Sequence, residues 1–172
     1  TILDIGTGTG CIPISLKANL PEANVSAIDV SEKALEVAKR NAVSNKVDIS
    51  FIQADILEVE DLSQYFDIIV SNPPYVTEDE MQMLDRSVAD FEPHEALYGG
   101  EDGLDFYRAI SEKWKAALAP GGRLYFEVGI GQADAVLRIM RAQGFGDIQV
   151  VKNHNDIPRV VFGTLCGEVY SE

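Results

Sequence analysis

Short apolar runs of strand length alternate with helical stretches along almost the whole chain. The apolar runs occupy residues 2–5, 24–30, 47–53, 66–71, 123–128, 147–152 and 159–165. Helical patterns fill most of the intervals, at about residues 11–20, 31–43, 78–90, 103–119 and 132–143. Strands that alternate with helices predict a parallel β-sheet with helices on both faces and with ligands at the carboxyl ends of the strands.

The last two apolar runs are joined only by a short polar turn, "NHNDIP". A strand, a turn and a strand in direct succession imply one antiparallel member of the sheet. The prediction is therefore an α/β fold, a Rossmann-like sandwich around a mostly parallel seven-stranded sheet with an antiparallel last strand.

The composition of the chain limits the class of protein it can be and the partners it can bind. With 172 residues, of which 46% are hydrophobic, the chain has the size and apolar content of one globular domain. None of its apolar runs approaches the roughly 20 residues of a membrane span, so no membrane partner is expected. The formal charge of −14 argues against direct nucleic-acid binding. Cys11 and Cys166 lie far apart without metal-ligand spacing, so we expect no metal site and a cytoplasmic protein.

Three glycines, Gly6, Gly8 and Gly10, lie between the first expected strand and the first expected helix. Glycine lets the backbone approach a ligand closely beside the positive end of the helix. A dinucleotide-binding loop has the pattern G-x-G-x-x-G, but here the third glycine comes one residue early and Cys11 stands in its place. NAD is therefore disfavoured as the ligand.

Two aspartates follow the next two expected strands. Asp29 ends the second strand, about twenty residues after the glycine loop, where a carboxylate can accept both hydroxyls of a ribose. Asp55 is the next acidic residue at the carboxyl end of a strand. Either residue alone could be a surface turn residue, but their joint placement beside the glycine loop favours a ligand site.

With Asp4 added, the pattern D-x-G-x-G-x-G followed by these two aspartates resembles that of class I S-adenosylmethionine-dependent methyltransferases. The resemblance implies the methyltransferase form of the Rossmann-like sandwich. It also implies S-adenosyl-L-methionine as cofactor and S-adenosyl-L-homocysteine as product. The cofactor contacts it implies are Asp4, Gly6, Thr7, Gly8, Gly10, Asp29, Asp55 and Asn72.

The segment "NPPY", Asn72 to Tyr75, ends the fourth expected strand and resembles the motif of methyltransferases that act on planar nitrogens. An NH2 group conjugated to a π-system is a poor nucleophile, so two acceptors must hold its hydrogens and orient its lone pair. Asn72 Oδ1 and the Pro73 carbonyl can be those acceptors, and the ring of Tyr75 offers a stacking face. We expect these three residues to be catalytic, with Pro74 joining them on the substrate side.

Two further segments, "FEPHEALYGGEDGLDFYR" and "LYFEVGIGQ", resemble the N5-glutamine methyltransferases that modify peptide chain release factors. This resemblance covers nearly the whole chain and implies methyl transfer to the side-chain amide nitrogen of a release-factor glutamine. The block that lies near the substrate in that family corresponds here to Glu92, Pro93, Gly99, Gly100 and Gly103. The family normally carries a small helical domain before the catalytic one, so we expect residues 1–172 to be the catalytic domain of a longer protein.

Three other functions share parts of this pattern. A methyltransferase acting on a ribosomal-protein glutamine would use the same site chemistry. An N6-adenine methyltransferase of DNA or RNA would share NPPY, but it needs a basic groove and a route for a flipped base, which the charge of −14 disfavours. A nucleotide-binding module without catalysis has no need for paired acceptors beside the methyl donor.

Overall fold

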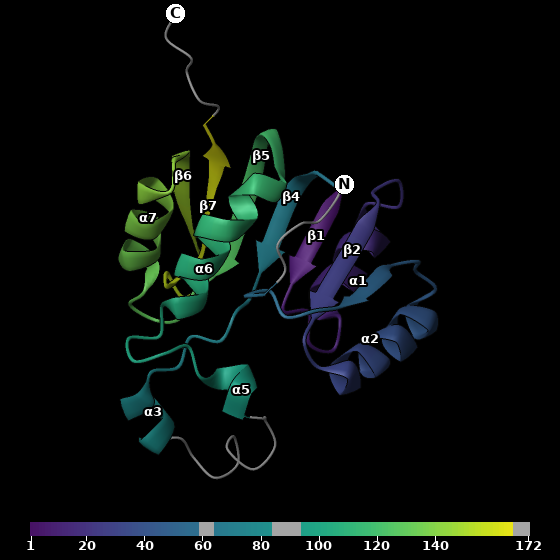
Figure 1. Ribbon diagram of the computed structural model, residues 1–172, viewed down its shortest axis with the longest axis horizontal. Helices are drawn as coiled ribbons and strands as arrows, with labels where there is room; N and C mark the ends of the chain where they lie inside the picture. Colours follow the sequence, from purple (N-terminus) through teal and green to yellow (C-terminus); the bar gives the residue numbers. More distant parts are fainter. Residues whose placement is uncertain (59–63, 84–93, 167–172) are drawn as a thin grey trace, which may run out of the picture.

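A seven-stranded sheet in the order β3-β2-β1-β4-β5-β7-β6 runs through the computed structural model, which describes residues 1–58, 64–83 and 94–166 (Figure 1). β7 pairs antiparallel with both β5 and β6, and the other neighbouring strands pair parallel. The predicted fold is therefore confirmed. The strands are β1 Ile2–Ile5, β2 Val25–Asp29, β3 Ser50–Gln53, β4 Phe66–Ser71, β5 Leu118–Glu127, β6 Phe145–Lys152 and β7 Pro158–Leu165.

Helices connect the strands on both sides of the sheet. α2 begins where predicted, because the Ser31 hydroxyl accepts the Ala34 N–H at 3.2 Å and caps the helix. No helix in the described ranges is long and apolar enough to cross a membrane. The helices are α1 Cys11–Asn19, α2 Glu32–Asn45, α3 Glu78–Met83, α5 His94–Leu97, α6 Asp105–Lys113 and α7 Ala133–Ala142, with a 3₁₀ turn η1 at Trp114–Ala117.

The helix predicted over residues 103–119 is shorter than expected. α6 ends at Lys113, η1 follows, and β5 begins at Leu118. Leu118 pairs with Phe66, and the register then shifts so that Arg123 pairs with Ile68. The prediction was wrong here because pairing with β4 outweighs the local helical pattern, and the residues around Pro120 form the irregular part of the strand.

The helix predicted over residues 78–90 can be followed only in part. Its first turn is α3, where Thr77 Oγ1 accepts the Glu80 N–H at 3.3 Å and Glu80 Oε2 accepts the Thr77 N–H at 3.0 Å. This reciprocal pair is a capping box, which fixes the start of the helix. The rest of the predicted helix, with Leu84 and Val88, lies outside the described residues, and the short helix α5 was not predicted.

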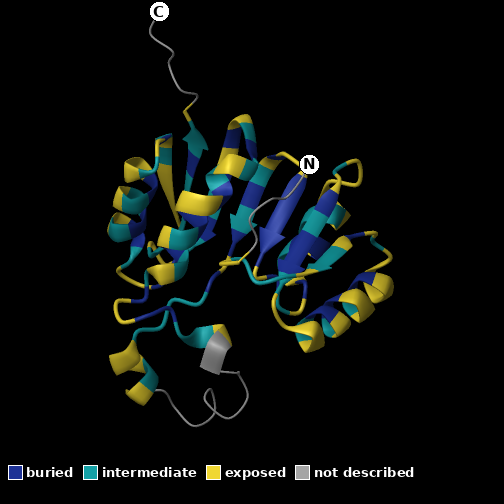
Figure 2. Ribbon diagram, viewed as in Figure 1, coloured by how far each residue is buried: buried dark blue, intermediate teal, exposed yellow. Residues whose placement is uncertain are grey.

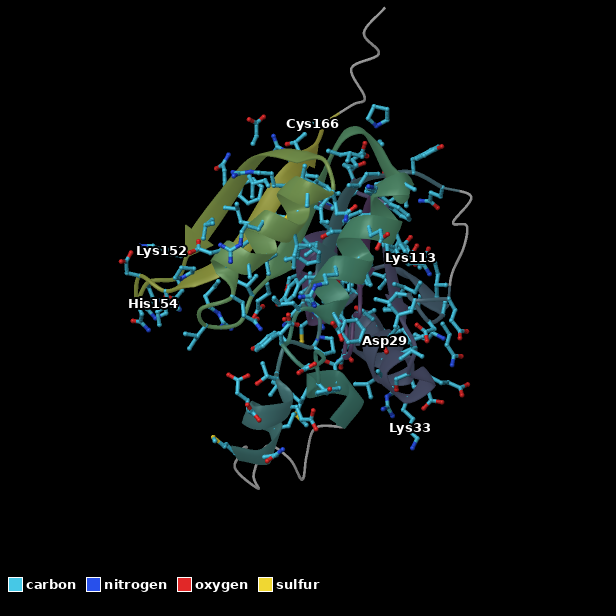
Figure 3. All side chains as sticks on the ribbon, turned by 60° about the vertical axis from the view of Figure 1, so that its left-hand side comes forward. Asp29, Lys33, Lys113, Lys152, His154 and Cys166 are labelled. Atoms are coloured by element: carbon cyan, nitrogen blue, oxygen red, sulfur yellow. The ribbon has the colours of Figure 1, made fainter. Side chains whose placement is uncertain are left out.

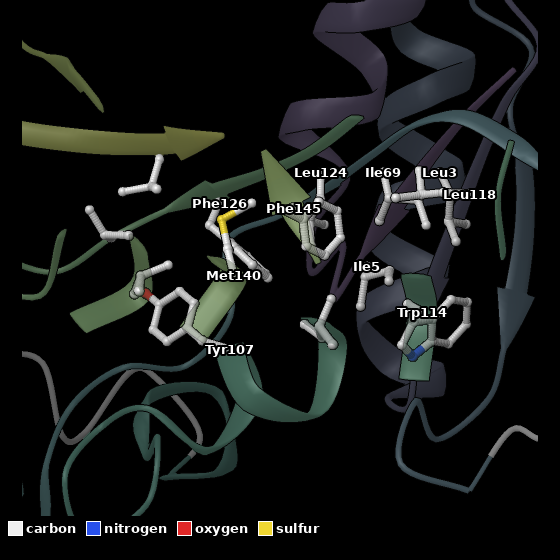
Figure 4. Close-up of a cluster of buried hydrophobic side chains, with 14 of the residues drawn as sticks. Leu3, Ile5, Ile69, Tyr107, Trp114, Leu118, Leu124, Phe126, Met140 and Phe145 are labelled. Carbon is white, nitrogen blue, oxygen red and sulfur yellow. The ribbon is translucent and has the colours of Figure 1, made fainter. Parts of the chain in front are cut away.

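Two apolar layers cover the two faces of the sheet. Many of the buried residues lie in the strands (Figure 2). Side chains alternate between the faces along a strand, so Leu3 and Ile5 join one layer while Ile2 joins the other. The first layer packs under α6 and α7 and holds the large side chains drawn in Figure 4, among them Leu3, Ile5, Ile69, Tyr107, Trp114, Phe126 and Met140. The second layer lies toward α1 and α2. β1 is therefore buried on both faces.

Asp4 is the one charged residue of this buried central strand, with no exposed surface. Neither of its carboxyl oxygens has a hydrogen-bond partner among the described residues. Burial raises the pKa of Asp4 from 3.8 to about 7; the Thr7 side chain opposes this rise and the negative charge of Asp29 adds to it. A carboxyl group that would be mostly ionised in water is therefore largely protonated in the folded chain below neutral pH.

This pKa predicts how stability depends on pH. Between pH 3.8 and about 7 the folded chain keeps a proton on Asp4 that the unfolded chain has released, so rising pH lowers the free energy of unfolding. Asp4→Asn has no such proton. Compared with this variant, the wild-type chain should lose up to about 4 kcal/mol of its free energy of unfolding as the pH rises over this range. Urea unfolding of both chains at several pH values measures the difference. If the free energies of unfolding of the two chains changed with pH in the same way, the raised pKa of Asp4 would be contradicted.

Candidate active site

The predicted site residues gather at one edge of the sheet, where β1, β2, β3 and β4 end. The strand registers place Ile5 beside both Ile28 and Ser71, and Asp29 beside Gln53. The chain order of the strands reverses between β1 and β4, which is where α/β sheets open a crevice for ligands. Figure 1 shows α3 and α5 beyond this same edge.

The glycine loop leaves β1 and is tied at once to β2, because the N–H groups of Gly6 and Thr7 both donate to the Ile28 carbonyl, at 2.9 and 3.1 Å. Gly6, Gly8 and Gly10 all have positive φ angles, of 71°, 53° and 84°. A Cβ built on Gly6 or Gly8 would meet nothing within 4 Å. The loop thus needs glycine for its conformation and faces open space, as a ligand cradle would.

Asp29 is held at the end of β2 by two backbone donors. Its Oδ2 accepts the Gly8 N–H at 2.7 Å, and its Oδ1 accepts the Ser31 N–H at 2.8 Å. The side chain is half-buried, and Figure 3 labels it on the side of the sheet where α3 and α5 lie. Each carboxylate oxygen can accept more than one hydrogen bond, so both can still take a ligand hydroxyl.

Asp55 lies next to this position. The Ala54 N–H donates to the Asp29 carbonyl at 3.1 Å, and Asp55 Oδ1 accepts the Leu57 N–H at 2.8 Å. The structure therefore brings the two predicted aspartates together at the ends of adjacent strands. Within the described ranges, no three His, Cys, Asp or Glu side chains are grouped so that they could hold a metal ion.

The side chains of Asp4, two residues before the glycine loop, and of Thr7, within the loop, are both buried. Thr7 Oγ1, like both carboxyl oxygens of Asp4, has no hydrogen-bond partner in the described part of the chain. Unpaired buried oxygens of this kind are costly unless a bound group or water supplies a donor. Together with the open glycine loop and Asp29, they fit a ligand that carries a ribose and a charged amino acid.

The NPPY segment begins directly at the end of β4. The buried Ser71 hydroxyl donates to the Ile5 carbonyl at 2.8 Å and so ties the segment to the glycine loop across the strand reversal. Asn72 is exposed, and its side chain makes no hydrogen bond to a described residue. Pro73 is buried, and its carbonyl also lacks a donor among the described residues. Two acceptors are thus available beside each other.

Tyr75 is positioned through both its backbone and its ring. Its carbonyl accepts a hydrogen bond from Gln132 Nε2 at 3.0 Å, and its ring packs against the core layer under α6 and α7. A Cβ on Gly129 would lie 2.9 Å from Tyr75 Cδ2. A hydrogen bond with the Tyr75 side chain, with help from Glu127, raises the pKa of Arg159. The stacking of a planar substrate on Tyr75 stays a prediction.

Part of the predicted substrate block lies against the same segment. The Val76 N–H donates to the Leu97 carbonyl and the Gly99 N–H donates to the Val76 carbonyl, both at 2.9 Å. A Cβ on Gly99 would lie 2.6 Å from the Pro74 carbonyl oxygen, and one on Gly103 would overlap the Tyr75 carbonyl. These glycines allow two loops to touch.

Other members of the predicted block are less informative. A Cβ on Gly100 would meet the Asp105 side chain, which is not part of the NPPY segment. Glu92 and Pro93 lie outside the described residues. Two residues with contacts in this region, Ser71 and Gln132, were not predicted from the sequence. Ser71 is only the last residue of a predicted strand. Gln132 ends the segment "LYFEVGIGQ", in which it was assigned no role.

Comparison with known proteins identifies the family and the relatives that this chain resembles. Residues 1–91 match the model of the methyltransferase small domain family. A release factor glutamine methyltransferase of Flavobacterium psychrophilum is 49% identical over 88% of this chain and 54% of its own length. One of Bacteroides thetaiotaomicron is 43% identical over 88% of this chain and 55% of its own length. The resemblance drawn from the sequence motifs is thus confirmed, and the chain spans about half the length of these curated relatives.

Solved structures share the fold at low sequence identity. A methyltransferase from Pyrococcus furiosus superposes with a TM-score of 0.74 at 18% identity, over 97% of this chain and 75% of its own. TrmN from Thermus thermophilus superposes with a TM-score of 0.67 at 24% identity, over 95% of this chain and 43% of its own. From the family match over its first 91 residues, the chain belongs to the methyltransferase small domain family.

Proposed function

We propose that this chain transfers a methyl group from S-adenosyl-L-methionine to the side-chain amide nitrogen of a glutamine in a peptide chain release factor. The observation that carries the proposal is the position of NPPY, whose Asn72 and Pro73 acceptors follow the strand end that Ser71 ties to the glycine loop. The curated relatives named above support the choice of substrate.

The residues at the ends of β1, β2 and β3 would hold the cofactor. Asp29 would accept the ribose hydroxyls, and the open face of the loop at Gly6 and Gly8 would receive the rest of the ligand. Asp4 and Thr7 would provide polar groups beneath the loop, and Asp55 would extend the site past β3. S-adenosyl-L-methionine supplies, when bound, a methyl group on a positively charged sulfur.

The NPPY segment would orient the nucleophile. The amide nitrogen of glutamine is conjugated with its carbonyl, so its lone pair must be turned out of conjugation before it can attack. Asn72 Oδ1 and the Pro73 carbonyl would each accept one N–H of the substrate amide and hold it in that orientation. No strong base is needed, because the proton can leave after the methyl group has been transferred.

Two of the alternative substrates could be methylated at the same site. A ribosomal-protein glutamine would present the same amide to Asn72 and Pro73. An adenine amine could also use the two acceptors, but the net charge of −14 opposes the phosphate contacts that bring a nucleic acid to a protein. The proposal therefore favours a protein glutamine.

Mass spectrometry tests the proposal directly. The protein is incubated with isotope-labelled S-adenosyl-L-methionine and with a release factor, a ribosomal protein or an adenine-containing oligonucleotide. We expect one labelled methyl group on a glutamine of the release factor. Label on the oligonucleotide alone, or on none of the three, would contradict the proposed function.

The first variant concerns the cofactor. Asp29→Ala removes the carboxylate proposed to bind the ribose and should weaken S-adenosyl-L-methionine binding by about 1.5–3 kcal/mol, since hydrogen bonds to a charged group are lost. Isothermal titration calorimetry measures the change. Asp48→Ala is the matched control, because Asp48 is exposed and precedes β3 at the opposite edge of the sheet. Equal affinity in the two variants would exclude Asp29 from the cofactor site.

The second variant concerns the nucleophile. Asn72→Ala should lower kcat by on the order of 100-fold or more and change cofactor affinity far less than Asp29→Ala does, because the main role proposed for Asn72 is to orient the substrate amide. Initial rates and calorimetry measure the two quantities. Asn155→Ala, in the exposed turn between β6 and β7, is the control. A variant at Asn72 with wild-type kcat would remove the paired-acceptor mechanism.

A further inference from the structure

The side chain of Gln132 joins three separate segments next to the NPPY motif. Its Oε1 accepts the Gly129 N–H at 3.1 Å, just after the end of β5. Its Nε2 donates to the Tyr75 carbonyl at 3.0 Å and to the Gly103 carbonyl at 3.3 Å. These three bonds connect the end of β5, the NPPY segment and the loop before α6.

A primary amide is the group that suits these three partners. It offers one oxygen acceptor and two N–H donors, which match one N–H group and two carbonyl groups. A carboxylate in the same place would face two carbonyl oxygens without a donor. Gln132 is the N-cap residue of α7, yet its side chain makes no capping bond to that helix, so it is directed to the loops.

The surrounding glycines let the three segments come this close. A Cβ on Gly129 would lie 2.6 Å from Gln132 Oε1. One on Gly103 would lie 2.7 Å from Gln132 Nε2 and would also overlap the Tyr75 carbonyl. Glycine at both places keeps the amide within hydrogen-bond distance of Tyr75.

The two prolines of NPPY couple the hydrogen bond at the Tyr75 carbonyl to the position of the Asn72 and Pro73 acceptors. Pro73 and Pro74 each have a fixed φ angle, so few rotations separate the Pro73 carbonyl from the Tyr75 carbonyl. At the other end of the segment, Ser71 is held to β1. The acceptors of Asn72 and Pro73 therefore lie on a short, stiff stretch that is anchored at both ends.

We propose that Gln132 is a positioning residue for methyl transfer, which sets the direction of the Pro73 carbonyl by anchoring Tyr75. This inference rests on the proposed function. It assigns to Gln132 no contact with substrate or cofactor. Loss of the anchor should misplace the acceptor pair and leave the cofactor loop unchanged.

The test compares Gln132→Ala and Gln132→Glu with Gln143→Ala. Gln143 is the C-cap residue of the same helix, and its side chain accepts a bond from Lys115 far along the chain from NPPY. We expect both variants at Gln132 to lower kcat for the release factor on the order of 10- to 100-fold with unchanged S-adenosyl-L-methionine affinity. Gln143→Ala should keep the wild-type kcat.

Hydrogen exchange gives a readout that needs no substrate. The amides of Val76 and Gly99 are bonded between the NPPY segment and its neighbouring loop, so they should exchange faster in Gln132→Ala and at the wild-type rate in Gln143→Ala. Wild-type exchange and wild-type kcat in the Gln132 variants would overturn the inference. A wild-type chain that transfers no methyl group would instead refute the proposed function, and the role of Gln132 in it. A general loss of folding would appear as a lower unfolding temperature and as faster exchange throughout the core.

Discussion

The burial of β1 between β2 and β4 is the constraint on which the site depends. Because β1 is covered on both faces and hydrogen-bonded on both edges, its carboxyl end has one fixed position. The glycine loop starts there, and the Ile5 carbonyl receives the Ser71 hydroxyl from β4. A change in the register of either neighbour would move Asp29 or Asn72 relative to the loop. The core thus determines the distance between the proposed methyl donor and its acceptor pair.

The two halves of the site are held in different ways. On the proposed cofactor side, the Asp29 carboxylate accepts two backbone N–H groups, so a side chain fixes the glycine loop against the end of β2. On the proposed substrate side, the stiffness comes from two prolines and from hydrogen bonds on either side of them, at Ser71 and Tyr75. From this division we expect a substitution in one half to leave the other half in place. It is also the reason that binding and turnover are measured separately for each variant.

The sequence predicted the sheet well, and it predicted which strand ends carry the candidate site residues, because both follow from local patterns. Seven apolar runs gave seven strands, and the rule that ligands lie at strand ends brought together Asp29, Asp55 and Asn72. The early start of β5 was missed, since it depends on the pairing of Leu118 with Phe66. The contacts of Gln132 were missed for a similar reason: they depend on three loops that meet only in the folded chain, and no local pattern marks them.

Buried polar groups without partners are concentrated where a ligand is proposed to bind. Such groups cost about 1–3 kcal/mol each, so a folded chain keeps few of them. Of the four buried side-chain atoms that lack partners in the described residues, three belong to Asp4 in β1 and Thr7 in the glycine loop, and the fourth, in Ser111, lies in α6. The Pro73 carbonyl, which also lacks a donor among the described residues, adds an acceptor on the proposed substrate side. In this interpretation the chain gives up some stability at the ends of β1 and β4, and the cofactor and the substrate amide supply the missing partners.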